Sequence, residues 1–309
     1  MMTIEKYIKN IRRKADSALK ANLPERKDKV SLGMRYACLG AGKRLRPILF
    51  ITTLESLGGK INKGVMKIAL AIEFIHTFSL IQDDLPSLDN DDYRRGRLTV
   101  HKAFGEDIAI LASDALLNEA YRIILEDSSI DPVLKVEVAI ELMRAVKNLI
   151  RGQEKDLGLT KPPHPKKTQF FRIGCGGKGT RISLLKLNEI YLDKTAVLIA
   201  ACIKIAGILR RAKSEELKWL NSFGEKLGLA YQISDDILNI TGDKEAFRGK
   251  QFSDQRKGRV TYVSLAGIKR SQEIAENLIR EAKKDLEKID NIDKEKLHCL
   301  CDFILKRTY

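Results

Sequence analysis

Acidic and basic side chains are concentrated in one short stretch of this chain, residues 80–97, which read LIQDDLPSLDNDDYRRGR. Five aspartates fall within ten positions, and Arg94, Arg95 and Arg97 follow at once. Charges of one sign packed this closely repel one another, so the stretch is either a solvated segment or a site built around a counter-charge. Carboxylate oxygens without His or Cys are ligands that suit a hard cation such as Mg²⁺.

The position of the first two aspartates favours a cation site. Asp83 and Asp84 close an apolar run of helical length, residues 64–82, and Pro86 ends it. Carboxylates at the C-terminal end of a helix oppose its dipole, so both the dipole and the carboxylates attract a cation. Asp89 can converge with Asp83 where the proline distorts the chain. The alternative is a cluster of N-cap residues for the next helix, since Asp and Asn are good caps.

A second acidic cluster decides between these alternatives. In YQISDDILNITGD, Asp235, Asn239 and Asp243 recur every four residues on one face of a predicted helix with many apolar neighbours. Unpaired carboxylates on a partly enclosed face cost too much to keep without a counter-charge. Two acidic clusters on apolar helices therefore predict facing metal sites with a polyphosphate between them. Arg94 and Arg95 would then donate to oxygens of the same phosphates.

The elements that must position these residues are helices. Apolar side chains recur with helical spacing, or fill blocks of helical length, along most of the chain. Residues 259–265 show a strand-like pattern, but they are too short and isolated to pair. We therefore predict an all-α fold, formed as a single domain over residues 1–309 around a central set of almost wholly apolar helices. The predicted helices cover residues 64–83, 105–126, 133–151, 187–210, 214–241, 272–288 and 293–307.

Composition narrows the partners of the protein. A total of 56 Lys and Arg against 41 Asp and Glu gives a net charge of +15, which favours anionic partners. No DNA- or RNA-binding motif accompanies that charge, so we expect no nucleic acid. The longest apolar run, residues 196–209, is shorter than the roughly 20 residues of a membrane span and contains Lys204, so we expect a buried helix and no span. Scattered cysteines and the absence of an apolar N-terminal signal favour the reducing cytoplasm.

Residues 161–182 differ from the rest of the chain. They contain three prolines, four glycines and six basic residues, with no acidic one. This composition predicts a long basic loop, which is either a mobile surface segment or a lid that closes over a phosphorylated substrate. Gly174, Gly176 and Gly179 have GxGxxG spacing, but no strand precedes them, so we interpret that match as accidental.

These motifs together resemble those of one enzyme family. DDLPSLDNDDYRRG is similar to the first aspartate-rich motif of the trans-isoprenyl diphosphate synthases, the farnesyl and geranylgeranyl diphosphate synthases, in its longer DDxxxxD form. QISDDILN is similar to the second motif. The resemblance continues in GAGKRLRP, EFIHTFSLIQDD, GQEKDL, DKTAVLI and GRVTY, in the order of the family, over residues 30–307.

The resemblance implies a helical bundle around a deep apolar cavity, usually as a homodimer. It implies a prenyltransferase that uses about three Mg²⁺ ions to condense isopentenyl diphosphate with dimethylallyl or geranyl diphosphate. Asp83 and Asp89 would bind two ions and Asp235 the third, with Asp84, Arg94, Arg95 and Lys194 completing the catalytic set. For the diphosphate of the allylic substrate, the implied contacts are Arg94, Lys194, Thr195, Gln232 and Lys250. For isopentenyl diphosphate they are Lys43, Arg46, His76 and Arg95. Arg259, which stands where the family has Lys, is a further implied substrate contact.

Two positions refine this expectation. Phe78 lies about 7.5 Å along the helix before Asp83, where a growing chain would descend. Its ring, with the small Ser79 beside it, predicts the fifteen-carbon product farnesyl diphosphate, with twenty-carbon geranylgeranyl diphosphate as the next alternative. Asn239 replaces the last aspartate of the second motif, and we expect a water-mediated role for it. This departure and the unusual loop keep open a catalytically weak regulatory or binding subunit of a hetero-oligomeric synthase.

Overall fold

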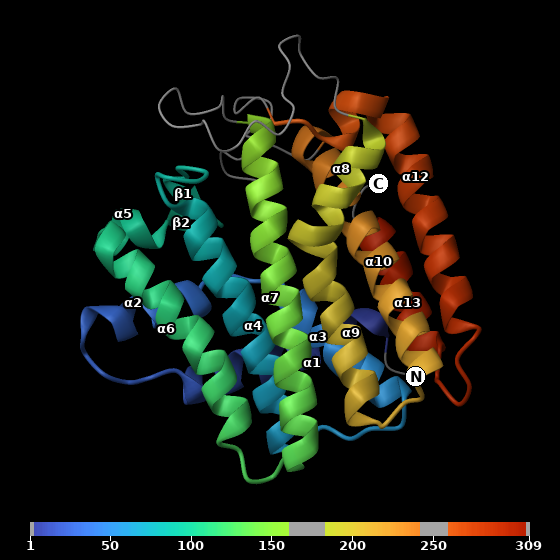
Figure 1. Cartoon of the computed structure of the whole chain (residues 1–309), viewed down its shortest axis with the longest axis horizontal. Coiled ribbons are helices and arrows are strands. Elements are labelled where there is room, and N and C mark those ends of the chain that lie inside the picture. The colour runs from blue at the N-terminus through green and yellow to red at the C-terminus, as the bar shows by residue number, and fades with distance from the viewer. Residues whose placement is uncertain (1–2, 161–182, 242–258, 307–309) are drawn as a thin grey trace, which may run out of the picture.

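The computed structural model describes residues 3–160, 183–241 and 259–306, which form helices and one short hairpin (Figure 1). Lys250 and the basic loop at 161–182 lie outside the described residues, as does Asp243. The elements in chain order are α1 (Ile4–Asn22), α2 (Lys29–Cys38), α3 (Leu45–Ser56), α4 (Lys63–Asp84), β1 (Tyr93–Arg94), β2 (Arg97–Leu98), α5 (Val100–Phe104), α6 (Glu106–Leu125), α7 (Pro132–Thr160), α8 (Leu184–Tyr191), the π-helix η1 (Leu192–Ala196), α9 (Val197–Leu209), α10 (Ser214–Thr241), α12 (Tyr262–Leu286) and α13 (Glu295–Lys306).

Local capping sets where several of these helices begin. The side chains of Thr3, Asp28, Asn62 and Ser183 each accept a backbone N–H from the first turn of the helix that follows. Thr261 and Ser264 form a reciprocal capping box at the start of α12. This cap explains why α12 begins at Tyr262, ahead of the predicted start at residue 272, and why residues 259–265 are not a strand.

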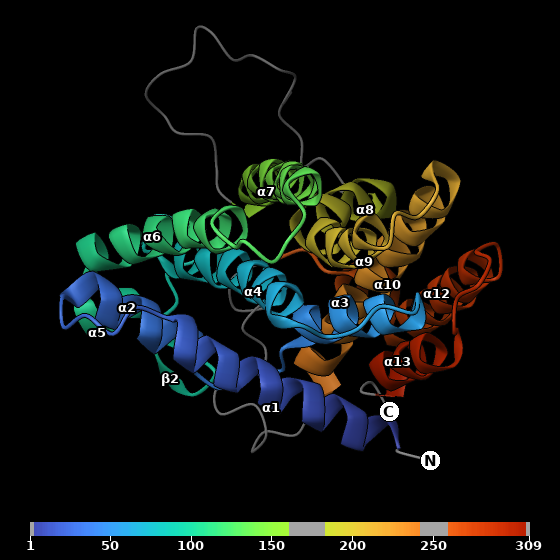
Figure 2. The same cartoon turned by 90° about the horizontal axis from the view of Figure 1, so that it is seen from below.

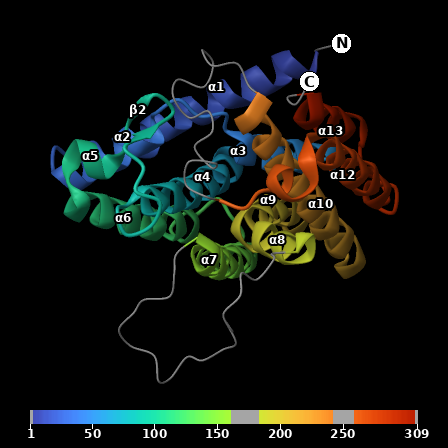
Figure 3. The same cartoon turned by 90° about the horizontal axis from the view of Figure 1, so that it is seen from above.

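The helix α4 lies in the interior of the bundle. It packs against α1, α3 and α6, and Figures 2 and 3 show it between α1 on one side and α6 on the other. By length and composition α4 could cross a membrane, with a mean hydropathy of 1.6, but 78% of that window is buried inside the protein. A helix that is apolar on all sides suits a position where other helices cover it.

The second half of the bundle surrounds α9 and α10. The α9 helix packs against α3, α7 and α10, while α12 and α13 cover α10. Phe50 of α3, Phe74 of α4 and Phe223 of α10 are fully buried and fill the core. Burying each such side chain contributes about 1.5–3 kcal/mol to folding. The predicted all-α fold is confirmed; the expectation of one domain stays a prediction.

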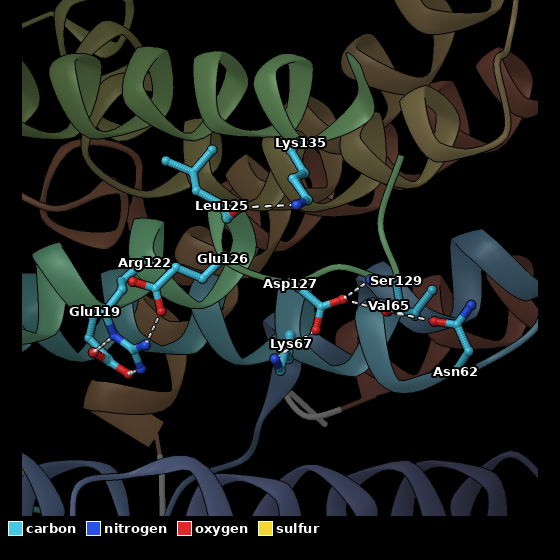
Figure 4. A network of polar contacts seen from close by, with 10 residues as sticks. All are labelled: Asn62, Val65, Lys67, Glu119, Arg122, Leu125, Glu126, Asp127, Ser129 and Lys135. Carbon is cyan, nitrogen blue, oxygen red and sulfur yellow. Dashed lines mark hydrogen bonds and ion pairs between the residues drawn. The ribbon is translucent and has the colours of Figure 1, made fainter. Parts of the chain in front are cut away.

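Polar contacts fasten the loop between α6 and α7 to the beginning of α4 (Figure 4). The ammonium group of Lys67 lies 2.6 Å from the carboxylate of Asp127, and Asp127 also accepts the backbone N–H of Ser129 at 2.8 Å. These contacts hold the end of α4 that is opposite its aspartates. The aspartate-bearing end is therefore positioned by a separate set of interactions.

Candidate active site

A cavity of about 310 Å³ is lined by residues from the C-terminal ends of α4 and α10, from α7, from the hairpin and from η1. Asp83, Asp89 and Asp235 all line this first cavity, and so do Lys194 and Thr195. Within the described residues, no group of three His, Cys, Asp or Glu side chains is close enough to hold a metal ion alone. The carboxylates thus share one cavity without forming a closed protein cage.

The adjacent aspartates of the first motif lie in different environments. Asp83 lines the first cavity, whereas Asp84, only 4% exposed, does not. Arg94 donates hydrogen bonds to the Asp84 carboxylate: its Nε lies 2.8 Å from both oxygens and its Nη2 lies 2.6 Å from Oδ1. Successive helix residues point about 100° apart, which separates the two carboxylates. We therefore interpret Asp84, which we had grouped with the catalytic carboxylates, as the residue that orients Arg94.

The electrostatics of the first cavity favour a cation. Burial raises the pKa of Asp83 to about 6; the charge of Lys194 opposes this shift and that of Asp89 adds to it. Asp89 forms an ion pair with Arg259, which lies just before α12. A buried carboxylate with a raised pKa is one whose charge is poorly compensated, so a cation that enters the cavity stabilises the ionised form.

The second motif, on α10, differs from the first in that both of its aspartates, Asp235 and Asp236, line the first cavity. Asp236 is nevertheless only 4% exposed and accepts hydrogen bonds from three residues. The donors are the Tyr191 hydroxyl at 2.7 Å, the Gln232 amide at 3.1 Å and the backbone N–H of Tyr262 at 3.1 Å. Through these contacts Asp236 ties α10 to α8 and α12 beside the cavity.

The π-helix η1 brings Lys194 and Thr195 to the cavity. A Cβ atom on Gly152 of α7 would lie 2.4 Å from the Lys194 backbone nitrogen, and one on Gly228 of α10 would lie 2.5 Å from the Ala196 Cα. Only glycine allows α7 and α10 to approach η1 this closely. The wide turn inserts an extra residue into the helix, a feature that often marks functional sites.

Neighbouring polar side chains orient the residues of η1. The Thr195 hydroxyl donates to the Gln232 amide oxygen at 3.0 Å, and the Lys194 ammonium contacts Asp156 at 2.5 Å. Gln153, also in the cavity lining, has both amide atoms buried without a hydrogen-bond partner among the described residues. We had assigned no role to Gln153 or Asp156, although both fall within GQEKDL; that motif was the available signal.

A second cavity of about 570 Å³ adjoins the first. Its lining includes Lys43, Arg46, His76 and Arg95, the four residues expected to hold isopentenyl diphosphate. The residues that line both cavities are Arg46, His76, Arg94, Arg95, Tyr231 and Asp235. Among the described residues, the Nε of Arg46 has no hydrogen-bond partner. Burial, followed by the positive charges of Arg46 and Arg95, holds the pKa of His76 well below its usual value. The second cavity therefore combines several cationic groups with a neutral imidazole.

The hairpin sets the positions of Arg94 and Arg95. Arg95 and Gly96 have φ angles of 53° and 77°, which form a two-residue turn between the short strands. Tyr36 anchors the second strand, because its hydroxyl donates to the Leu98 carbonyl at 2.8 Å and its ring lies 4.0 Å from the Arg97 guanidinium.

The predicted chain-length residues lie on different sides of α4. Ser79 lines the first cavity, whereas Phe78 is buried in the core and is absent from the lining of both cavities. Leu80, Leu149 and Tyr231 give the first cavity part of an apolar wall, but most of its lining is polar. The deep apolar cavity therefore stays a prediction.

The comparisons with known proteins agree with this geometry. The profile of the polyprenyl synthetase family matches residues 28–296. A dimethylallyltranstransferase from Fischerella ambigua is 38% identical over 98% of this chain and 83% of its own length, and a farnesyl diphosphate synthase from Micrococcus luteus is 36% identical over 89% and 88%. The crystal structure of an FPP/GFPP synthase from Zymomonas mobilis superposes with a TM-score of 0.80 at 28% identity, covering 98% of each chain.

The chain therefore belongs to the polyprenyl synthetase family, the trans-isoprenyl diphosphate synthases. The resemblance seen in the sequence is confirmed, and so is the prediction that the protein is an enzyme of the trans-prenyltransferase class.

Proposed function

We propose that this protein joins isopentenyl diphosphate to an allylic diphosphate and releases inorganic diphosphate. The C1–O bond of the allylic substrate breaks, and its electron pair leaves with the diphosphate. The double bond of isopentenyl diphosphate then forms a carbon–carbon bond to that C1, and an oxygen of the released diphosphate takes the proton that is lost. The observation that carries this proposal is the pair of adjoining cavities, which offer separate sites for two diphosphates.

The first cavity suits the leaving diphosphate. We propose that Asp83, Asp89 and Asp235 hold Mg²⁺ there, which when bound neutralises the negative charge of the diphosphate. The donor set fits this ion: it consists of carboxylate oxygens, and it is not a closed cage, so coordination is shared with phosphate oxygens. Lys194 and Arg94 supply fixed positive charge where the leaving group develops its negative charge.

The second cavity suits isopentenyl diphosphate. Lys43, Arg46 and Arg95 offer cationic donors to its phosphates, and His76 contributes a neutral imidazole between the two cavities. The apolar side chains of Leu80 and Tyr231 help to keep water from the allylic carbon.

We propose farnesyl diphosphate as the main product. The support is Ser79 in the lining of the first cavity, with Phe78 buried in the core one position earlier on α4. Replacing Ser79 with Phe should shorten the product because the ring would enter the cavity, and Phe78→Ala should lengthen it. Unchanged product length in both variants would remove these residues from the account.

We also propose a homodimer formed through α6 and α7. Apolar side chains of both helices are exposed along one surface, a pattern that commonly marks an interface. Val133, Val136, Ile140 and Met143 recur with helical spacing on α7, and Ile110 and Leu111 lie on α6. Sedimentation equilibrium should show a dimer that Met143→Glu weakens; a monomeric wild type would contradict this.

A cytoplasmic location is also proposed. Cys38, Cys202, Cys299 and Cys301 are free thiols, as a reducing compartment would keep them. Fractionation of cells that express the full chain checks this, and recovery outside the soluble cell contents would oppose it.

The alternative function is a regulatory or binding subunit of a hetero-oligomeric synthase. The observation that favours it is Asn239, which leaves the second motif one carboxylate short. Purified protein, isopentenyl diphosphate and either dimethylallyl or geranyl diphosphate should give a prenyl diphosphate only with Mg²⁺, as read by chromatography. Folded protein that binds diphosphate but makes no product would instead support the subunit function.

A further inference from the structure

An arginine between two predicted substrate contacts is bound by other protein groups. Lys43, Arg44 and Arg46 all line the second cavity, but Arg44 is only 4% exposed and its guanidinium is taken up by neighbouring side chains and carbonyl groups. It donates from Nε to Asp16 at 2.7 Å, from Nη1 to Glu73 at 2.8 Å and from Nη2 to the carbonyl oxygens of Cys38 and Gly40 at 2.7 Å and 3.2 Å. One side chain thus connects α1, the end of α2 and the middle of α4.

The backbone of Arg44 is in a conformation that non-glycine residues rarely adopt. Its φ of 51° and ψ of 35° place it in the left-handed region, directly before the first residue of α3. This conformation costs a residue with a side chain about 1–2 kcal/mol. The four hydrogen bonds of the guanidinium hold the chain in this conformation between Lys43 and Arg46.

Glu73 links this bend to the opposite wall of the cavity. It is 2% exposed, lies one helical turn before His76 and lines the second cavity. Its Oε2 has no hydrogen-bond partner among the described residues. A buried pair with an unsatisfied oxygen gives little stability compared with apolar side chains of similar size. Folding stability alone is therefore a weak reason for placing this pair here.

The position of Arg44 also limits where Arg95 can lie. A Cβ atom on Gly42 would be 2.6 Å from the Nη1 of Arg44 and 2.8 Å from the Nη1 of Arg95. Both guanidiniums therefore occupy the space that a side chain at residue 42 would need. Because Glu73 and Asp16 hold the Arg44 guanidinium in place, they also limit the space left to the Arg95 guanidinium beside Gly42.

We propose that Arg44, Glu73 and Asp16 are positioning residues for the isopentenyl diphosphate site. They place Lys43, Arg46 and Arg95 at the spacing that its two phosphates require, without contacting the substrate themselves. This inference rests on the proposed function. It also predicts that binding of isopentenyl diphosphate is more sensitive to this network than binding of the allylic substrate.

The test replaces both charges of the pair at once, in Arg44→Met/Glu73→Gln, so that no unpaired charge is left buried. The KM for isopentenyl diphosphate should rise about 10- to 100-fold, because small misplacements of binding groups have large effects. The KM for the allylic diphosphate should change less than about threefold. Calorimetric titration of the metal-free protein with isopentenyl diphosphate should show the same loss of affinity.

The matched control is Lys67→Met/Asp127→Asn, which removes a pair of the same kind at the other end of α4. It should lower the melting temperature by a similar amount and leave both KM values unchanged. Equal changes in the two KM values of the Arg44→Met/Glu73→Gln variant, or no change in either, would overturn the inference.

A third variant separates positioning from charge. Arg44→Lys keeps the positive charge but cannot reach Asp16, Glu73 and two carbonyl groups together. We expect its KM for isopentenyl diphosphate to remain raised; a KM close to that of the wild type would show that charge alone matters. If the wild-type protein itself shows no turnover, the proposed function has failed, and the metal-free titrations still decide the positioning role.

Discussion

The two aspartate-rich motifs hold the second of their adjacent carboxylates differently. Asp83 and Asp235 both line the first cavity; of the buried aspartates that follow them, Asp84 lies outside that lining and Asp236 lies within it. The Asp84 carboxylate is held by a charged group, Arg94, which itself lines both cavities. The Asp236 carboxylate accepts hydrogen bonds from neutral donors of Tyr191, Gln232 and Tyr262.

This difference shows that the two motifs have different supporting roles. The first motif connects its buried carboxylate directly to a group proposed to bind phosphate. The second motif connects its buried carboxylate to the packing of α8, α10 and α12 through Tyr191 and Tyr262, and also to Gln232, an expected diphosphate contact without charge. Substitutions at Asp84 should therefore affect substrate binding through a charged group, whereas those at Asp236 should affect folding more than binding.

The largest expected effect is on turnover after loss of the first aspartate of either pair. Asp83→Ala should lower kcat by about 10³-fold and Asp235→Ala by about 10²-fold, because we propose that Asp83 binds metal together with Asp89, whereas Asp235 lies in the motif that carries Asn239. Steady-state kinetics at saturating Mg²⁺ measures this, with circular dichroism as the control for folding. A greater loss in Asp235→Ala would reverse the ranking of the motifs.

The next effect concerns the second aspartate of each pair. Asp84→Asn breaks a buried ion pair and should reduce the free energy of unfolding by about 3 kcal/mol. Asp236→Asn replaces one acceptor oxygen with an NH₂ group, so one of the neutral donors loses its acceptor. The free energy of unfolding should fall by about 1–2 kcal/mol. Urea denaturation of both variants provides the comparison. Equal losses of unfolding free energy would mean that the charge of Arg94 stabilises Asp84 no more than the neutral donors stabilise Asp236.

A smaller effect should follow from making the second motif complete. Asn239→Asp adds a carboxylate and should strengthen Mg²⁺ binding about 3- to 10-fold in the presence of an allylic diphosphate analogue. The Mg²⁺ dependence of turnover and the binding of Mn²⁺ followed by electron paramagnetic resonance both report this. Unchanged metal affinity would show that residue 239 does not contribute to the site.

The smallest expected effect is the pH response of the second cavity. Because the pKa of His76 is held well below its usual value, the imidazole is neutral where an ordinary histidine would titrate. His76 should then add no step of its own to the pH profile of the KM for isopentenyl diphosphate, so the wild type and His76→Gln should give profiles of the same shape. A step in the wild type that is absent from His76→Gln would contradict this assignment.

The sequence was sufficient to predict the long helices that carry the site. The run before Pro86 ends at Asp84 as expected, and α10 has the predicted bounds, because hydrophobic spacing and chain breakers act locally. The N-terminal helices α1, α2 and α3 were not predicted, and the segment 187–210 is divided by η1 instead of forming one helix. A π-turn depends on close contacts with Gly152 and Gly228, which are far away in the sequence.

Only part of the candidate site was predicted from the sequence, because the contacts between its residues depend on packing between distant segments. Motif residues such as Asp83 and Arg46 could be named from their types and order, and the structure brings them to the two cavities. The burial of Asp84 and the contacts of Arg44 could not be predicted, because they depend on how α1, α2 and α4 pack together. Residue type alone does not distinguish an arginine that is proposed to bind substrate, such as Arg46, from one that holds the chain before α3, such as Arg44.

The central claim is that the two cavities bind two different diphosphates, of which only one needs metal. Calorimetric titration of the wild-type protein with isopentenyl diphosphate, and separately with an unreactive thiolo analogue of geranyl diphosphate, tests this directly, each with Mg²⁺ and with a chelator. We predict that isopentenyl diphosphate binds with similar affinity in both conditions, whereas the allylic analogue binds tightly only with Mg²⁺. Binding of both ligands that depends equally on Mg²⁺, or of neither, would contradict the account.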